Sequence, residues 1–131
     1  MNMRTIIPAD YTQLIEFWKQ NYFVNDMDNI DRFTVFLNKN PDLSVLMEDD
    51  GIIIGTVLGS FDGRRGYLQK VVTHTRYRKT GVARQLIMEI IKRFRALGVL
   101  YIPVNVGEET FDFYEKCGFR KTKQISMNMT L

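Results

Sequence analysis

The chain has 131 residues, of which 45% are hydrophobic and 25% are charged. These proportions and this length are ordinary for one folded globular unit, so we expect a single domain over residues 1–131 and not a disordered chain. No apolar run reaches the ~20 residues of a membrane span, and the N-terminus lacks a signal-peptide pattern, which predicts a cytoplasmic protein without a membrane partner. The single cysteine, Cys117, excludes an intramolecular disulfide and cysteine-based metal clusters.

The charged residues are unevenly distributed, although the formal net charge is only +3. The window from Arg64 to Arg95 contains ten Lys or Arg residues, whereas the first fifty residues carry an excess of acids. This asymmetry predicts an anionic ligand on one side of the molecule and a cationic one near the acids. Solvated helix faces are the alternative explanation for both groups.

The N-terminal part of the chain predicts a strand followed by two helices. The strand covers 3–7, and Pro8 and Asp10 then open a helix, with Asp10 and Gln13 at the spacing of a capping box. A second helix is predicted over 29–38, with Ile30 on its inward face, and Pro41 ends it.

The middle of the chain predicts three antiparallel strands joined by tight turns. The strands cover 43–47, 52–58 and 67–73, with Asp50-Gly51 and Asp62-Gly63 as the turns between them. A helix follows over 81–97, where apolar residues recur close to the helical period, and Gly98 suits its C-terminal end.

The C-terminal part predicts a buried strand over 99–104, a short helix over 108–117 and one or two strands within 119–130. A strand, helix and strand in succession make a parallel right-handed crossover. The whole order therefore describes an α+β sandwich whose sheet mixes antiparallel and parallel pairs.

Several common sites are absent from the sequence. There is no P-loop pattern and no dinucleotide-binding glycine pattern. One histidine and one cysteine cannot supply an ordinary zinc site or a Ser-His-Asp triad, so we expect no metal.

The stretch from Thr75 to Arg84 is the most informative part of the chain. A basic loop with a glycine, at a strand-to-helix turn, presents backbone N–H groups without partners, and the helix end adds a positive dipole. Such a turn binds anionic phosphate oxygens. In the spacing Arg78-x-x-Gly81-x-Ala83, the small residues allow backbone to approach a pyrophosphate closely; a purely structural glycine is the alternative.

The second informative segment is Phe113-Tyr114-Glu115-Lys116-Cys117-Gly118-Phe119. A tyrosine near the start of a short helix that follows a strand can direct its hydroxyl into the crevice between two strands. There it could act as a general acid, protonated at neutral pH. The alternative is a core tyrosine with a tethered hydroxyl.

Together the two segments resemble the Gcn5-related N-acetyltransferase (GNAT) superfamily, and most closely its small single-domain bacterial members. The resemblance rests on Val71-Val72-Thr73 followed by Tyr77-Arg78-x-x-Gly81-Val82-Ala83-Arg84, on the segment around Tyr114, and on the stretch from Gly55 to Gly63. It implies an α+β (α/β mixed sheet) fold of the acyl-CoA N-acyltransferase type, with a central mixed sheet of about six or seven strands flanked by about four helices.

The resemblance also implies an activity, which is acetyl transfer from acetyl-CoA to a primary amine by direct attack in a ternary complex. Tyr114 would protonate the leaving thiolate, and the strand residues 71–73 would meet the pantetheine arm. The residues that the resemblance assigns to the cofactor are Val71, Val72, Thr73, Arg78, Lys79, Thr80, Gly81, Val82, Ala83, Arg84, Asn105, Phe113 and Lys116.

The acceptor side is less defined by the sequence. No carboxylate occupies the strand over 67–73, where some relatives place a general base. His74, at the end of that strand, could serve, as could a carboxylate from Asp26, Asp28 or Glu108, or a water relay. The acidic loop that holds Asp26 and Asp28 would attract a cationic amine, although helix capping explains these acids equally well.

Two other functions stay open at this point. A CoA-binding or acyl-CoA-sensing module without catalysis would keep the basic turn, and a nucleic-acid-binding protein would use the basic window, but would need exposed aromatic residues among the charges. We expect no nucleic-acid partner. The acceptor is a small-molecule amine or a peptide or protein amine, and the protein is a monomer or a homodimer.

Overall fold

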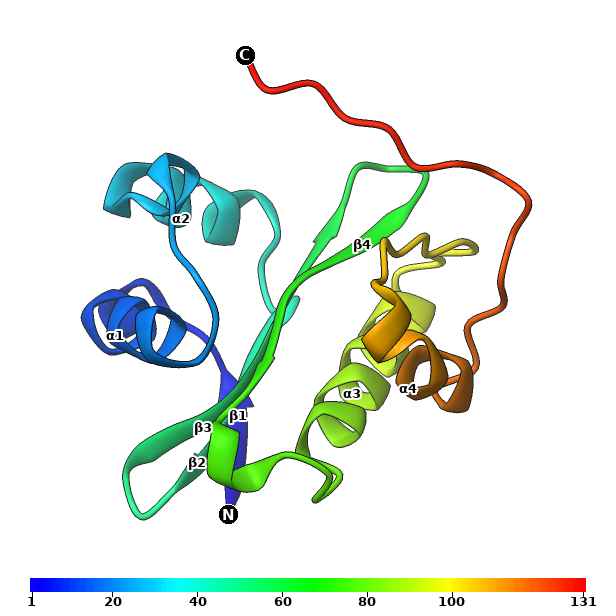
Figure 1. The fold of residues 1–131 in the computed structure, drawn as a ribbon. Helices are drawn as coiled ribbons and strands as arrows, with labels where there is room; N and C mark the ends of the chain where they lie inside the picture. Colours follow the sequence, from blue (N-terminus) through cyan, green and yellow to red (C-terminus); the bar gives the residue numbers. More distant parts are fainter.

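The computed structural model describes residues 1–131 and shows one sheet between two helical layers (Figure 1). The strands are β1 (Asn2–Thr5), β2 (Ser44–Asp49), β3 (Ile52–Phe61) and β4 (Gly66–Thr73), and the α-helices are α1 (Tyr11–Asn21), α2 (Ile30–Lys39), α3 (Val82–Ala96) and α4 (Phe111–Lys116). Short 3₁₀ turns cover Pro8–Asp10, Asp26–Asp28, Thr75–Tyr77 and Glu108–Thr110. The predicted strands and helices up to residue 97 are confirmed within a few residues at their ends.

The four strands pair in the order β1-β2-β3-β4, and every pair is antiparallel. Asp50 and Gly51 both have positive φ, at 51° and 75°, which is the backbone that a tight hairpin of this hand requires. This confirms the turn predicted at Asp50-Gly51. β4 is therefore an edge strand, and its side away from β3 carries no partner strand.

The strand residues alternate between two hydrophobic clusters, one on each face of the sheet. In β2, Val45 and Met47 belong to the cluster under α3, whereas Leu46 belongs to the cluster under α1 and α2. Figure 1 shows α1 and α2 on one face of the sheet and α3 and α4 on the other. A strand buried on both faces by helices explains why β3 reads as a nearly continuous apolar run.

Two glycines of β3 let α3 approach the sheet closely. A Cβ at Gly55 would lie 2.6 Å from Cγ1 of Val82, and a Cβ at Gly59 would lie 3.2 Å from Cγ2 of Ile90 and 2.4 Å from the carbonyl oxygen of Leu43. The glycines of the stretch from Gly55 to Gly63 thus have a packing reason at the first two positions.

The predicted strand over 99–104 is wrong, because this segment forms no strand. One backbone hydrogen bond, from the N–H of Gly66 to the carbonyl of Tyr101 at 2.9 Å, joins it to β4. Pro103 explains the interruption, since proline has no N–H to donate to a ladder. The sheet consequently has no parallel pair, and it has four strands where about six or seven were expected.

The strands predicted within 119–130 are also wrong, since the tail is extended and makes no strand pairing. Its alternating apolar residues are exposed, as Ile125 and Met127 illustrate at 86% and 89%. Figure 1 shows the tail leaving α4 and crossing, in this view, above the end of the β3–β4 hairpin before it reaches the C-terminus.

Two smaller expectations are also corrected. Asp10 does not cap α1: its carboxylate accepts hydrogen bonds from the Arg4 guanidinium at 2.8 and 2.9 Å and from the Ile7 N–H at 2.8 Å. Ile30 is exposed and not inward.

None of the helices has the length and apolar character of a membrane span.

Candidate active site

The turn between β4 and α3 presents a run of free backbone donors. None of the N–H groups from Arg78 to Arg84 donates a hydrogen bond, and the first N–H of this region that does, that of Gln85, bonds the Gly81 carbonyl at 3.0 Å. Lys79 and Gly81 have positive φ, at 63° and 89°. When φ alternates in sign along the chain, successive N–H groups point toward one side, and here they form a concave anion site at the positive end of α3.

Three side-chain hydrogen bonds fix the start of this turn, two of them to other parts of the fold. The Asn21 side chain at the end of α1 accepts from the Thr75 N–H at 3.1 Å, and the His74 Nδ1 accepts from the Arg76 N–H at 3.1 Å. The Tyr77 hydroxyl donates to Asp49 in the β2–β3 hairpin at 2.6 Å, and this hydrogen bond raises the pKa of Tyr77. The free donors are therefore presented by an anchored backbone.

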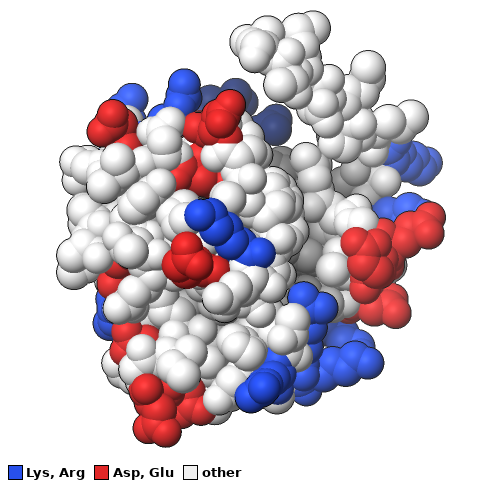
Figure 2. Space-filling view, turned by 60° about the vertical axis from the view of Figure 1, so that its left-hand side comes forward, with Lys and Arg blue, Asp and Glu red and all other residues white.

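Basic side chains surround the turn. Arg78, Lys79 and Arg84 are exposed and make no ion pair within the protein. Figure 2 shows Lys and Arg side chains gathered at the lower right of the displayed face, at the level at which the turn lies in Figure 1. Unpaired cations around free N–H groups favour a polyanionic ligand such as a pyrophosphate.

The strand that leads into the turn has a free edge and a bulge. On β4, Lys70 and Val71 together oppose Val57, because the pairing passes from Thr56↔Val72 to Leu58↔Gln69. The main-chain groups of residues 71–73 that face away from β3 have no partner strand. An extended arm with amide groups can pair with such an edge in the manner of an added strand.

Tyr114 lies on α4, packed between Phe113 and Phe119 with ring centroids 5.1 and 5.6 Å away. Burial, together with the neighbouring Cys117 and Tyr22 side chains, raises its pKa to about 12. The hydroxyl makes no hydrogen bond within the protein, yet no fully buried side-chain polar atom lacks a partner, so the hydroxyl reaches the surface. This excludes the alternative in which the Tyr114 hydroxyl is tethered by a hydrogen bond within the core.

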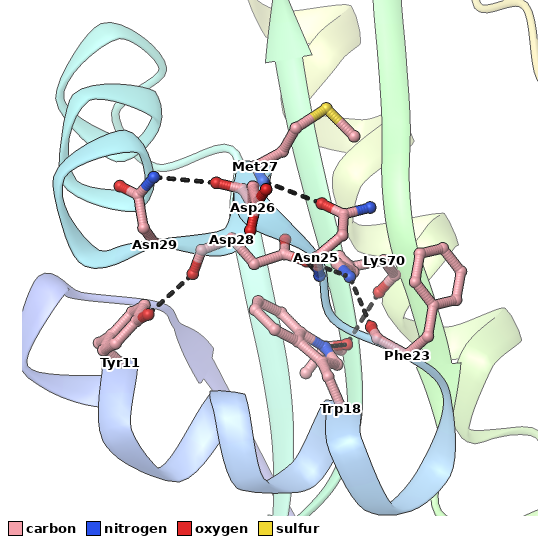
Figure 3. A network of polar contacts seen from close by, with 10 residues as sticks. Tyr11, Trp18, Phe23, Asn25, Asp26, Met27, Asp28, Asn29 and Lys70 are labelled. Carbon is pink, nitrogen blue, oxygen red and sulfur yellow. Dashed lines mark hydrogen bonds and ion pairs between the residues drawn. The ribbon is translucent and has the colours of Figure 1, made fainter. Parts of the chain in front are cut away.

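In the acidic loop between α1 and α2, the carboxylates of Asp26 and Asp28 differ in whether they have partners (Figure 3). Asp28 accepts from the Asn25 N–H at 2.9 Å and pairs with Lys70 at 3.0 Å, so its charge is already neutralised. The Asp26 side chain is exposed and makes neither a hydrogen bond nor an ion pair. Helix capping explains part of the loop, because Asn25 and Asn29 cap the 3₁₀ turn and α2.

The remaining predicted residues lie in less defined surroundings. His74 caps the 3₁₀ turn with its Nδ1, so in the neutral ring the proton is on Nε2, the nitrogen left free. Asn105 and Lys116 are exposed and make no side-chain hydrogen bond, whereas Phe113 packs against the core beside Tyr114. Their roles stay predictions.

Residues 71–73 lead directly into the turn. Val71, Phe113 and Tyr114 pack against the same hydrophobic cluster, which also contains Val82 at the start of α3. Sequence reasoning missed Lys70 and Tyr22. A lysine directly before the apolar pair Val71-Val72 was the only available indication of the former.

Comparisons with known proteins identify the family of this chain. The sequence profile described as the "Acetyltransferase (GNAT) family" matches residues 10–119. An acetyltransferase of Pectobacterium atrosepticum is 30% identical over 138 residues, which cover 100% of this chain and 96% of the relative. An acetyltransferase of Yersinia pestis is 29% identical with the same coverage.

Solved structures share the fold at lower identity. A glucosamine-6-phosphate N-acetyltransferase from Arabidopsis thaliana has a TM-score of 0.76 and 20% identity, covering 98% of this chain and 97% of the other. An aminoglycoside 6'-N-acetyltransferase from Acinetobacter haemolyticus has a TM-score of 0.77 and 14% identity, covering 100% and 99%. Since the profile matches most of the chain and a relative at 30% identity spans all of it, this chain is an acetyltransferase of the GNAT family.

Proposed function

We propose that this protein is an N-acetyltransferase that transfers the acetyl group of acetyl-CoA to a primary amine within a ternary complex. The observation that carries the proposal is the run of seven consecutive backbone N–H groups, Arg78 to Arg84, without an acceptor. A pyrophosphate supplies acceptors of the charge and geometry that this run and its basic side chains satisfy.

The edge of β4 supports the placement of the rest of the donor. With the pyrophosphate at the turn, the pantetheine arm would extend along residues 71–73, whose outward groups are free. A backbone N–H of the bulge, where Lys70 and Val71 oppose one residue, is a candidate donor to the thioester carbonyl. Such a donor would stabilise the negative charge that develops on this oxygen during attack.

In the reaction, the neutral amine nitrogen forms a bond to the thioester carbon while the carbon–sulfur bond breaks; the nitrogen loses one proton as the amide forms, and the leaving sulfur gains one. Tyr114 is the proposed proton donor to the leaving sulfur. Its pKa of about 12 keeps it protonated at neutral pH. A thiol has a pKa of ~8.5, about 3.5 below that of Tyr114, so full proton transfer to the thiolate is uphill in the free protein, and hydrogen-bond donation would provide the first stabilisation.

The acceptor side favours a cationic amine. Asp26 is an exposed carboxylate without a partner, which would attract an ammonium group to the rim of the site. Two proteins of the same fold are named N-acetyltransferases of glucosamine-6-phosphate and of aminoglycosides, which supports an amine as the acceptor here. Because β4 carries no carboxylate, we expect either water or the Asp26 carboxylate to accept the proton that the ammonium group loses.

The test begins with calorimetry of CoA binding and continues with thiol release from acetyl-CoA across a panel of polyamines, aminoglycosides, amino acids and peptides. We expect CoA to bind and at least one amine to stimulate thiol release. Tyr114→Phe should leave CoA affinity unchanged and reduce turnover about 10²-fold, the range of a lost general acid. Failure of the wild-type protein to bind CoA would overturn the proposal.

The second candidate is a CoA-binding module without catalysis. It is favoured by one observation, which is the lack of a carboxylate on β4 from Gly66 to Thr73. In that case CoA would bind, no amine would stimulate thiol release, and Tyr114→Phe would change neither quantity.

A further inference from the structure

Lys70 occupies a cage that joins the sheet to the segment between α1 and α2 (Figure 3). Its ammonium donates to the carbonyl oxygen of Phe23 at 2.8 Å and to the Asp28 carboxylate at 3.0 Å. It also lies over the rings of Trp18, Tyr22 and Phe23, 5.1, 5.5 and 4.7 Å from their centroids. The Lys70 side chain is 10% exposed and that of Asp28 is 14% exposed.

This arrangement satisfies an ammonium group on nearly every side. Hydrogen-bond acceptors take two of its three donors, and aromatic faces attract the cation where water has been removed. Lys70 lies in the bulge of β4 and has a φ of 48°, in the left-handed region that residues with a Cβ rarely adopt. Its carbonyl is held by the Thr56 hydroxyl at 2.8 Å, and the same hydroxyl accepts from the Trp18 indole at 3.0 Å.

The position of the cage connects it to the proposed reaction. Lys70 directly precedes residues 71–73, the edge proposed for pantetheine, and forms the bulge with Val71. Tyr22, one wall of the cage, is close enough to Tyr114 to raise its pKa. The segment that Lys70 holds therefore borders both the donor strand and the proposed acid.

We propose that Lys70 is a positioning residue for acetyl transfer: its ammonium holds the segment Tyr22–Asp28 against β4 and so builds the wall on which the acceptor amine docks. The proposal rests on the proposed function for the identity of the reaction. It also assigns the charges of the loop, since Lys70 neutralises Asp28 and leaves Asp26 as the carboxylate available to a cationic acceptor.

The test compares Lys70→Met, which keeps an unbranched apolar stem but removes the ammonium, with Lys70→Arg, which keeps a cation. We expect Lys70→Met to raise the KM for the best amine of the panel at least ~10-fold while the KM for acetyl-CoA changes less than ~2-fold. Lys70→Arg should recover part of the acceptor KM. Equal increases in both KM values would indicate general damage to the fold and would overturn the proposal.

A readout independent of turnover is backbone hydrogen exchange. We expect Lys70→Met to accelerate exchange in residues 22–28 at least ~10-fold, with β2 and β3 unchanged. Asp28→Asn removes the ion pair but keeps the aromatic rings, and it should produce a smaller acceleration of exchange in residues 22–28. This variant provides the test if Lys70→Met does not fold. Unchanged exchange in 22–28 for both variants would refute the hold exerted by Lys70.

Failure of the proposed function gives a different pattern. If the wild-type protein acetylates no amine while Lys70→Met still accelerates exchange in 22–28, the proposed function and the acceptor role of Lys70 both fail, and the hold remains as a structural contact. If the wild-type protein acetylates an amine and the acceptor KM of Lys70→Met is unchanged, the proposal alone fails.

Discussion

The hydroxyl of Thr56 joins Trp18 to the bulge of β4, and its removal gives the most direct test of this structure. Thr56 is 0% exposed and Trp18 is 1% exposed. The hydroxyl accepts from the indole N–H at 3.0 Å and donates to the carbonyl of Lys70 at 2.8 Å. Thr56→Val keeps the shape of the side chain but leaves a buried indole donor and a strand carbonyl without partners.

The magnitude follows from these two orphaned groups. Each buried polar group that loses its partner costs about 1–3 kcal/mol, and the carbonyl can recover part of this through water, so we expect a loss of about 3 kcal/mol for Thr56→Val. With the free energy of unfolding of a domain at about 5–15 kcal/mol, this is a large fraction of the total. Thr56→Ser is the matched control, because it keeps the hydroxyl and loses one methyl group, at a cost of about 1 kcal/mol.

The assay is urea unfolding followed by far-ultraviolet circular dichroism and by the fluorescence of Trp18, the single tryptophan. At a denaturant slope of about 2 kcal/mol per molar, the midpoint of Thr56→Val should fall by about 1.5 M and that of Thr56→Ser by about 0.5 M. A midpoint for Thr56→Val equal to that of Thr56→Ser would refute the reasoning, since the methyl group and not the hydroxyl would then carry the effect.

Three further changes test other parts of the structure. Gly59→Ala should destabilise the fold by about 2 kcal/mol in thermal unfolding, because its Cβ would lie 2.4 Å from a backbone oxygen, that of Leu43; an unchanged midpoint would contradict this packing. Burial raises the pKa of Tyr114 to about 12, so on raising the pH the unfolded chain releases this proton first, and the free energy of unfolding falls between about pH 10 and 12. Tyr114→Phe should lose less stability over this pH range. If the wild-type protein and the variant lost stability equally there, the raised pKa would be excluded. Burial raises the pKa of Asp10, but hydrogen bonds from Arg4 and from the Ile7 N–H outweigh this effect, so that the pKa of Asp10 is lowered in the folded protein. The stability that the ionised carboxylate contributes is therefore lost as the pH falls below about 4. In Asp10→Asn the urea midpoint should depend less on pH in this range, and a dependence as steep as that of the wild-type protein would disprove the reasoning.

Local physical chemistry explains why much of the fold could be predicted from the sequence. The apolar period of residues 81–97, the positive φ that Gly98 supplies at the end of α3 and the Asp50-Gly51 turn each depend on a few neighbouring residues. The same holds for the free donors of the turn, because a helix start always leaves N–H groups unpaired and Gly81 can adopt a φ of 89°.

The failures have an equally physical origin. Apolar content alone predicted a strand over 99–104, but Pro103 cannot donate to a ladder, and strand pairing depends on a partner edge that no local pattern encodes. Lys70 and Asp28 are 42 positions apart in the chain, so neither residue indicates the other in the sequence. Their contact follows from the packing of α1 and α2 on the sheet.

This difference between local and distant contacts explains why the sequence supports a proposal for the donor but not for the acceptor. The proposed cradle for the donor is mostly main chain, and a short run of residues with a glycine is sufficient to shape it. The proposed acceptor wall is made of side chains from α1, the loop after it and β4, which meet only in the folded protein. If the acceptor binds at this proposed wall, substitutions at Tyr22 or Asp26 change which amine docks while the backbone of the turn keeps its conformation. On this argument, variants of the segment Tyr22–Asp28 should alter acceptor preference while leaving CoA affinity unchanged.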